Sequence, residues 1–177
     1  MKVGSAAGAF LLALMIVSFP SGPAGGEGTT EQKPLEDPLL DKLVGDWDVE
    51  RKFPSGRVAH NTVHVEWVLQ HQFVELRYRD VASPPMYEAI VLIGYDTPAK
   101  RYLCHWADVF GAEYSVDGFA ARDPASNGIE FKFAARDGGL TNRFAFDPGK
   151  QIWTSTIRQI ENNEWKLFCE DTFVPAK

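Results

Sequence analysis

Apolar and polar residues alternate with a period of two along most of the chain from residue 46 onward. In the stretch 62–69, for example, Val63, Val65 and Trp67 alternate with polar residues. This alternation is typical of a β-strand with one buried face. It predicts strands over residues 46–53, 62–69, 73–79, 88–94, 101–109, 113–120, 129–134, 140–146, 151–160 and 164–174.

Residues 38–44 follow a different pattern. Their apolar residues recur at helical spacing, at Leu39, Leu40, Leu43 and Val44. The spacing predicts a short amphipathic helix that ends at Gly45, and we expect this helix to plug one end of the fold. Gly45 and Trp47 then open the first strand, as in many small antiparallel barrels, and we assign both a structural role.

The segments between the predicted strands are short and rich in turn-forming residues. Residues 123–128, 137–139, 147–150 and 161–163 are rich in Asp, Asn, Pro and Gly. None has the dozen residues that a parallel crossover needs, so sequential strands must pair antiparallel. The sequence therefore predicts an all-β, antiparallel up-and-down barrel of about nine or ten strands, with its first and last strands paired. A two-sheet sandwich is the alternative.

The N-terminus predicts export from the cytosol. Lys2 precedes an apolar segment at residues 4–19, and small residues around Ala24 offer cleavage sites, as in a signal peptide. An uncleaved membrane anchor is the alternative. We therefore divide the chain into a signal peptide (1–24), a disordered linker (25–37) and a barrel domain (38–177), located in the periplasm or secreted.

Composition excludes some partners. The formal net charge is −6, and 45% of the residues are hydrophobic, which suffices for a buried core. No cluster of basic residues could pair with a run of phosphates, so nucleic acid is not expected as a partner. The oligomeric state stays open.

Five short motifs resemble a bacterial family of undetermined function that is built as lipocalin-like barrels. They are Leu43-Val44-Gly45-Asp46-Trp47, Glu66-Trp67-Val68-Leu69, Gly94-Tyr95-Asp96, Arg101-Tyr102 and Trp106-Ala107-Asp108. The resemblance spans residues 39–173 and implies a distant similarity to the calycins, which include lipocalins, fatty-acid-binding proteins and haem-binding nitrobindins. It implies binding of small apolar molecules. The nitrobindin-like proximal His is missing from residues 165–173, so no haem or other cofactor is expected.

The candidate ligand-binding residues are mostly aromatic side chains expected to face the barrel interior. They are Trp67, Tyr78, Trp106, Tyr114, Phe131, Phe133 and Phe144. They would line a ligand cavity, or they would fill the interior as a packed core. The sequence leaves both alternatives open.

His105 lies in residues 102–108, a segment that contains a phenol, a thiol, an imidazole, an indole and a carboxylate. Alternation places His105 and Asp108 on opposite faces of an unbulged strand. If His105 faces inward, it could bind the polar end of a ligand; if it faces outward, it is a surface residue. An enzyme built on His105 with Asp108, Glu88 or Asp171 is a further alternative, and no catalytic residue is assigned.

Asp171 shares the alternating face of Trp165, Leu167, Cys169 and Phe173. If that face is inward, Arg158 on the preceding strand is the expected partner, and the two could anchor the polar end of a ligand. If the strand end emerges into solvent, Asp171 has no such role. We also expect a cation, Arg158 or Lys166, to lie over the ring of Trp47.

Cys104 and Cys169 fall in the middle of the fifth and last strands, where we expect two free, buried thiols rather than a disulfide. The histidines and cysteines form no close pairs with metal-ligand spacing, so no metal site is expected. His60, His64 and His71 are expected to be solvated.

Three classes of function follow. The first is an exported protein that binds a small apolar or amphipathic molecule inside the barrel. The second is a structural or partner-binding module of the cell envelope with a filled barrel, and the third is a calycin-type enzyme.

Overall fold

The computed structural model describes residues 33–134 and 139–177. The expected signal peptide and residues 25–32 of the expected linker lie outside the described residues. The elements are α1 (Pro38–Asp41), β1 (Gly45–Lys52), β2 (Val58–Val68), β3 (Phe73–Asp80), β4 (Glu88–Asp96), β5 (Arg101–Asp108), the 3-10 turn η1 (Ala112–Tyr114), β6 (Val116–Ala121), β7 (Gly128–Phe133), β8 (Leu140–Asp147), β9 (Ile152–Glu161) and β10 (Glu164–Pro175).

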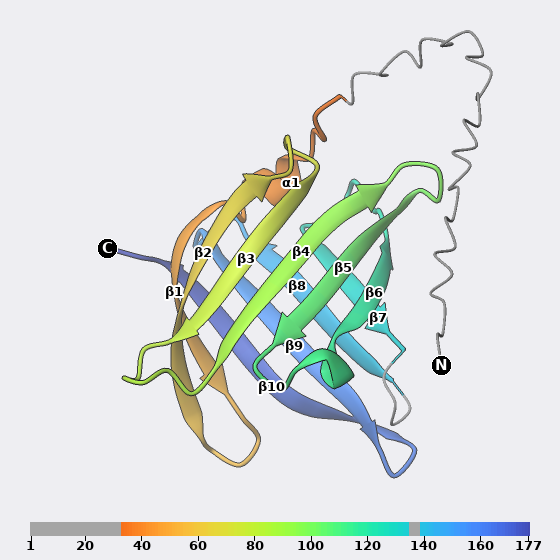
Figure 1. Ribbon diagram of the computed structural model, residues 1–177. Coiled ribbons are helices and arrows are strands. Elements are labelled where there is room, and N and C mark those ends of the chain that lie inside the picture. Colours follow the sequence, from red (N-terminus) through yellow and green to blue (C-terminus); the bar gives the residue numbers. More distant parts are fainter. Residues whose placement is uncertain (1–32, 135–138) are drawn as a thin grey trace, which may run out of the picture. The chain divides into compact units, whose positions relative to one another are not determined.

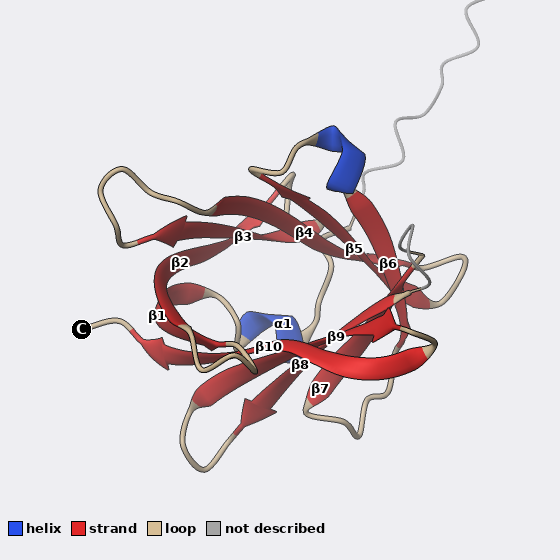
Figure 2. Ribbon diagram, turned by 90° about the horizontal axis from the view of Figure 1, so that it is seen from below, coloured by secondary structure: helices blue, strands red, loops and turns tan. Residues whose placement is uncertain are grey.

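The strands close into a single barrel. The order around the sheet is β1-β10-β9-β8-β7-β6-β5-β4-β3-β2, and each pair is antiparallel (Figures 1 and 2). β1 pairs with β10 so that Val49 lies opposite Phe173. The predicted up-and-down barrel is therefore confirmed with ten strands, and the two-sheet sandwich is wrong.

The helix α1 lies inside one end of the barrel, in blue in Figure 2. Leu40 and Leu43 are 0% and 1% exposed. Two tryptophan side chains donate hydrogen bonds to the backbone just after α1. Trp47 Nε1 donates to the carbonyl oxygen of Leu43 at 2.8 Å, and Trp153 Nε1 donates to the carbonyl oxygen of Lys42 at 2.9 Å. The predicted short N-terminal helix is confirmed.

The residues just before α1 are bound to the barrel. Asp37 is 1% exposed, and its carboxylate accepts hydrogen bonds from the backbone N–H groups of Leu39 and Leu40, which caps the helix. The N–H of Leu35 donates to the carbonyl of His71 at 2.9 Å. The prediction of a disordered linker is wrong for residues 33–37, because these contacts fix them to the barrel.

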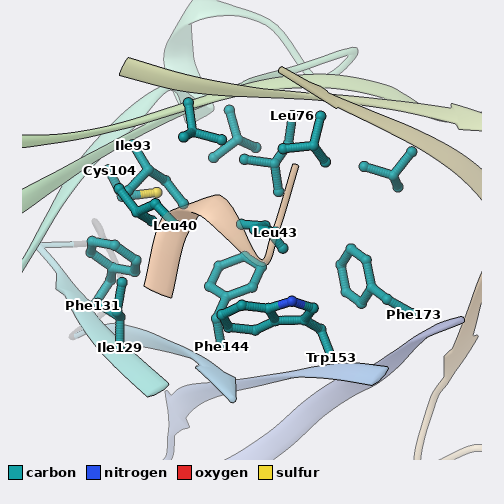
Figure 3. Close-up of a cluster of buried hydrophobic side chains, with 14 of the residues drawn as sticks. Leu40, Leu43, Leu76, Ile93, Cys104, Ile129, Phe131, Phe144, Trp153 and Phe173 are labelled. Atoms are coloured by element: carbon teal, nitrogen blue, oxygen red, sulfur yellow. The ribbon is translucent and has the colours of Figure 1, made fainter. Parts of the chain in front are cut away.

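The middle of the barrel is packed with side chains. Figure 3 shows large apolar groups from several strands gathered around α1. Leu76, Phe131, Trp153 and Phe173 are each 0% exposed. A void that admitted one water molecule would leave accessible area on its lining, so these side chains fill the space at their level.

Two local features differ from the predicted strands. Residues 113–115 do not belong to a strand, because η1 occupies Ala112–Tyr114 and β6 begins at Val116. In β10, Leu167 lies opposite Arg158 while Cys169 lies opposite Ile157, so Phe168 is an extra residue. Such a bulge reverses the alternation.

The bulge separates residues that the sequence placed on one face. Cys169, Asp171 and Phe173 are 0% exposed and face the interior. Trp165 and Leu167 lie on the other side of the bulge and are 50% and 41% exposed. The prediction that all five share a face is therefore wrong for Trp165 and Leu167.

Candidate functional site

A polar cluster lies in the barrel interior toward the end opposite α1. We call it the Arg51 cluster; it comprises Arg51, Tyr78, Tyr87, Trp106 and Asp171. The alternation of β1 turns Arg51 to the same side as Trp47 and Val49. The cluster is thus built from β1, β3, β5, β10 and the residue before β4.

Arg51 and Asp171 form a bidentate ion pair. Arg51 Nε lies 2.6 Å from Asp171 Oδ1, and Arg51 Nη2 lies 2.7 Å from Asp171 Oδ2. The two residues face each other across the seam of the barrel, since they are direct partners in the β1–β10 pairing. Burial by itself lowers the pKa of Arg51, but the hydrogen bonds and charge of Asp171 outweigh it and hold that pKa above its ordinary value.

Tyr78 places an unpartnered hydroxyl beside this ion pair. The residue is 2% exposed, and its hydroxyl has no hydrogen-bond partner among the described residues. Its ring lies 5.4 Å from that of Trp106 and 6.0 Å from the guanidinium carbon of Arg51. Burial, and then the charge of Asp171, raise the pKa of Tyr78. A buried hydroxyl without a partner destabilises a fold by about 1–3 kcal/mol.

Tyr87 lies beside Arg51, and Trp106 lies beside Tyr78. Both Tyr87 and Trp106 are half-buried. The guanidinium carbon of Arg51 lies 5.2 Å from the ring centre of Tyr87, and the Tyr87 hydroxyl donates a long hydrogen bond of 3.4 Å to Asp108. Burial raises the pKa of Tyr87 to about 12, although the positive charge of Arg51 opposes the shift.

A second buried polar pair continues the cluster around the barrel. Ser155 on β9 is the direct partner of Asp171 on β10, and its hydroxyl donates to Asn142 Oδ1 at 2.8 Å. Asn142 is 1% exposed, and its Nδ2 has no partner within the described part of the chain. The interior therefore holds two buried polar groups with unused hydrogen-bonding capacity.

Exposed apolar side chains surround the same end of the barrel. We call them the apolar rim; it comprises Val81, Met86, Val109, Phe110 and Tyr114, which are 52–80% exposed. They lie in the β3–β4 and β5–β6 connections, at the lower end in Figure 1. Phe110 links this rim to the cluster, because its ring lies 6.3 Å from those of both Tyr87 and Tyr114.

The predicted aromatic residues fall into separate regions. Tyr78 and Trp106 belong to the Arg51 cluster, whereas Phe131, Phe133 and Phe144 are buried in the apolar core. Trp67 lies at the α1 end, where its Nε1 donates to Asp41 Oδ1 at 3.0 Å and its ring stacks on His71. Tyr114 is 60% exposed, so the expectation that it faces the interior is wrong.

His105 faces outward. Its Nδ1 lies 2.6 Å from Asp117 Oδ1, and its side chain is 45% exposed. Glu88 is also outside, where it forms a salt bridge with Arg79. The prediction that His105 could face inward is therefore wrong. Asp171 is buried in the interior and Glu88 pairs with Arg79, so the structure does not bring His105 together with either carboxylate as the enzyme alternative requires.

Arg158 lies on the outer face of β9 and is exposed. The predicted pair with Asp171 is wrong, because Arg51 occupies both carboxylate oxygens. The predicted cation over Trp47 is wrong as well. Arg158 and Lys166 lie near the β9–β10 turn, whereas Trp47 lies opposite Pro175 at the other end of β10 and packs edge-on against Phe173.

Sequence reasoning missed Arg51 and Tyr87. The signal for Arg51 was available, because residue 51 alternates in phase with Trp47 and Val49, two apolar positions of the predicted strand 46–53. Tyr87 had no such signal, since it lies in an irregular loop before β4.

Both cysteines are free and buried, so the prediction of two thiols rather than a disulfide is confirmed. Burial raises the pKa of Cys169 to about 12 and that of Cys104 well above its ordinary value. Neither thiol is therefore ionised near neutral pH.

Two cavities lie on the outer face of the barrel. One of about 300 Å³ is lined by residues that include Asp46, His64 and Arg77, and one of about 460 Å³ by residues that include Glu50 and His60. Both are open to solvent over the β1–β2 region. Across residues 33–134 and 139–177, no group of three or more His, Cys, Asp or Glu side chains is placed to hold a metal ion.

Comparisons with known proteins do not place the chain in a family. No protein-family model matches it, and no curated protein matches it. Among solved structures it is similar to one described as a redesigned β-barrel, with 12% identity and a TM-score of 0.40, covering 78% of this chain and 96% of that chain. Within the described residues, no helix is both long and apolar enough to cross a membrane.

Proposed function

We propose that the protein is an exported, lipocalin-like barrel that binds a small apolar or amphipathic molecule at the end carrying the Arg51 cluster. The observation that carries this proposal is the unpartnered Tyr78 hydroxyl, 2% exposed beside the Arg51–Asp171 pair. A buried polar group without a partner is rare and often marks a functional site. A ligand that brings a hydrogen-bonding group to this point would remove the penalty.

The surroundings of Tyr78 support this location. The middle of the barrel is solid around Trp153 and Phe131, so the proposed site is at the end of the barrel and not along its whole length. Trp106 and Tyr87 are half-buried, and the apolar rim beyond them provides area against which an apolar body can pack. Export is proposed from Lys2 and the apolar segment 4–19.

Titration with Nile red, an uncharged apolar dye that bears a carbonyl group, tests the proposal. We expect saturable binding with one dye per protein. Tyr78→Phe keeps the ring and removes the hydroxyl, and it is expected to weaken the affinity about fivefold to tenfold, the value of one hydrogen bond.

Tyr102→Phe is the matched control for this experiment. It also removes a buried hydroxyl, which donates to Asp37 at 2.6 Å at the α1 end of the barrel. It should leave the affinity for Nile red unchanged. Absence of saturable binding, or equal losses in the two variants, would overturn the proposal.

A filled-barrel module that binds a partner protein of the cell envelope is the second candidate. The solid core and the exposed apolar rim favour it, since such patches mark interaction surfaces. Native mass spectrometry of the protein purified from its own source separates the two candidates. A retained small molecule supports the first, and a retained protein partner supports the second.

A further inference from the structure

We infer that the ligand carries an uncharged hydrogen-bonding group, a hydroxyl or a carbonyl, on an apolar body, and that the site disfavours the corresponding carboxylate. This inference rests on the proposed function and specifies the chemical class of the ligand. It follows from the charges and the unused hydrogen-bonding groups of the Arg51 cluster.

The buried cation of the cluster is already neutralised. Arg51 directs Nε and Nη2 at the two oxygens of Asp171, in a bidentate pair whose side chains are 7% and 0% exposed. The guanidinium carbon of Arg51 also lies 5.2 Å from the ring centre of Tyr87. A ligand carboxylate would have to compete with Asp171 for the guanidinium, and either carboxylate left without it would be a buried, unpaired charge.

A further carboxylate, that of Asp108, lies beside the cluster. Asp108 accepts the hydrogen bond from Tyr87 and is half-buried at the end of β5. Arg51, Asp171 and Asp108 together carry a net charge of −1, and the carboxylate of Asp108 would repel an anionic group placed next to Tyr87. A cationic group in the interior would find no free carboxylate there, because both oxygens of Asp171 are paired with Arg51, so it would be a buried, unpaired charge. Both signs of ligand charge are therefore opposed.

The unpartnered Tyr78 hydroxyl can form a hydrogen bond with an uncharged oxygen atom of a ligand. The Tyr78 hydroxyl can both donate and accept hydrogen bonds. A ligand hydroxyl or carbonyl oxygen accepts such hydrogen bonds without adding charge. Tyr78 itself stays neutral, because burial raises its pKa.

The neighbouring side chains accommodate the rest of such a molecule. Trp106 packs against Tyr78, and Tyr87, Phe110 and Tyr114 form a row of ring contacts from the cluster to the rim. These groups offer aromatic surface and few charges. An alkyl or ring system attached to the polar group would pack along this row.

Displacement of bound Nile red by 1-dodecanol and by dodecanoate tests the inference. The two compounds have the same chain length and differ in the charge of the polar end at about pH 8, where dodecanoate is ionised. We expect 1-dodecanol to displace the dye at a concentration at least about tenfold lower than dodecanoate.

Asp108→Asn removes the negative charge beside Tyr87. The variant should therefore lower the concentration at which dodecanoate displaces the dye, and so reduce the difference between the two compounds. Asp123→Asn is the control, since it makes the same charge change on the β6–β7 connection, next to Arg122, which contacts Asp37 at the α1 end. Displacement by dodecanoate at an equal or lower concentration than 1-dodecanol would overturn the inference while leaving the binding function intact. Failure of Nile red to bind would overturn the proposed function itself.

Discussion

Arg51 and Asp171 keep two charges inside the barrel by facing each other across its seam. Removing both ions from water is unfavourable, and the bidentate geometry offsets that penalty only while both partners are present. The neighbouring Ser155 and Asn142 add a buried hydrogen bond, so the polar groups run across four adjacent strands. A change of one charge should therefore be far more damaging than a change of both.

Asp171→Leu is expected to lower the free energy of unfolding by about 3–5 kcal/mol, because Arg51 keeps its charge and loses its partner. The double variant R51M/D171L should recover most of that loss, since it leaves no buried charge. Urea denaturation of the single and double variants measures both effects. A double variant no more stable than Asp171→Leu would show that the ion pair itself stabilises the fold.

Tyr78→Phe is expected to change stability in the opposite direction from most core substitutions. Because the hydroxyl has no partner among the described residues, its removal should raise the free energy of unfolding by about 1–3 kcal/mol. Tyr102→Phe should lower it by about 1 kcal/mol, since that hydroxyl is hydrogen-bonded to Asp37. Thermal unfolding of the two variants compares them, and a destabilised Tyr78→Phe would mean that its hydroxyl is satisfied.

The inward positions of Arg51 and Asp171 could be predicted from alternation, but their pairing could not be predicted in full. The two residues are 120 positions apart. They meet only because β1 and β10 close the barrel with one particular register. Closure was predicted, yet the register depends on the packing of both strand faces, which alternation alone does not specify.

Two elements show where the hydrophobic pattern is sufficient and where it is not. The α1 helix was predicted because its apolar residues recur at helical spacing and Gly45 follows them. The η1 turn was not predicted, because Tyr114 fits the alternation of the predicted strand 113–120 although it is exposed. The connection before α1 was also misassigned, since the contacts of Asp37 reach strands distant in sequence.

Asp37 fixes α1 to the barrel wall at several points. It caps the helix, accepts from the Tyr102 hydroxyl, and lies 3.4 Å from Arg122 Nη2. Asp37→Ala is expected to lower the free energy of unfolding by about 2–4 kcal/mol, the sum of a lost N-cap and a newly orphaned buried hydroxyl. Glu36→Ala, at an exposed neighbour, should change it little. Urea denaturation provides the comparison, and equal effects would contradict the role given to Asp37.

At the scale of the whole molecule, the closed sheet and the solid middle have different causes. Closure follows from short antiparallel connections, which the sequence makes plain. Filling depends on the summed volume of interior side chains, and ten strands enclose a space that Trp153, Phe131 and Leu40 happen to occupy. Alternation predicts which residues face inward and not whether they meet, so the sequence left an open cavity and a packed core as alternatives.

The same packed interior makes stability sensitive to alkaline pH. Burial raises the pKa of Cys169 from 9.0 to about 12 and that of Tyr87 from 10.0 to about 12. Above its ordinary pKa, each group loses its proton in the unfolded chain and keeps it in the folded one. The unfolded state then binds fewer protons, so the free energy of unfolding falls as pH rises.

We expect this fall to begin near pH 9 and to continue to about pH 12, at up to about 1.4 kcal/mol per pH unit for each group. Cys169→Ala removes one of these groups. The variant should therefore lose about 2 kcal/mol less than the unchanged protein between about pH 8 and pH 10.5, even if it starts less stable. Urea denaturation at the two pH values measures the difference, and the general repulsion of a more negative chain cancels in the comparison. Equal falls in the free energy of unfolding of the two proteins would mean that the Cys169 thiol has the same pKa in the folded and unfolded states, and hence that this end of the barrel admits water.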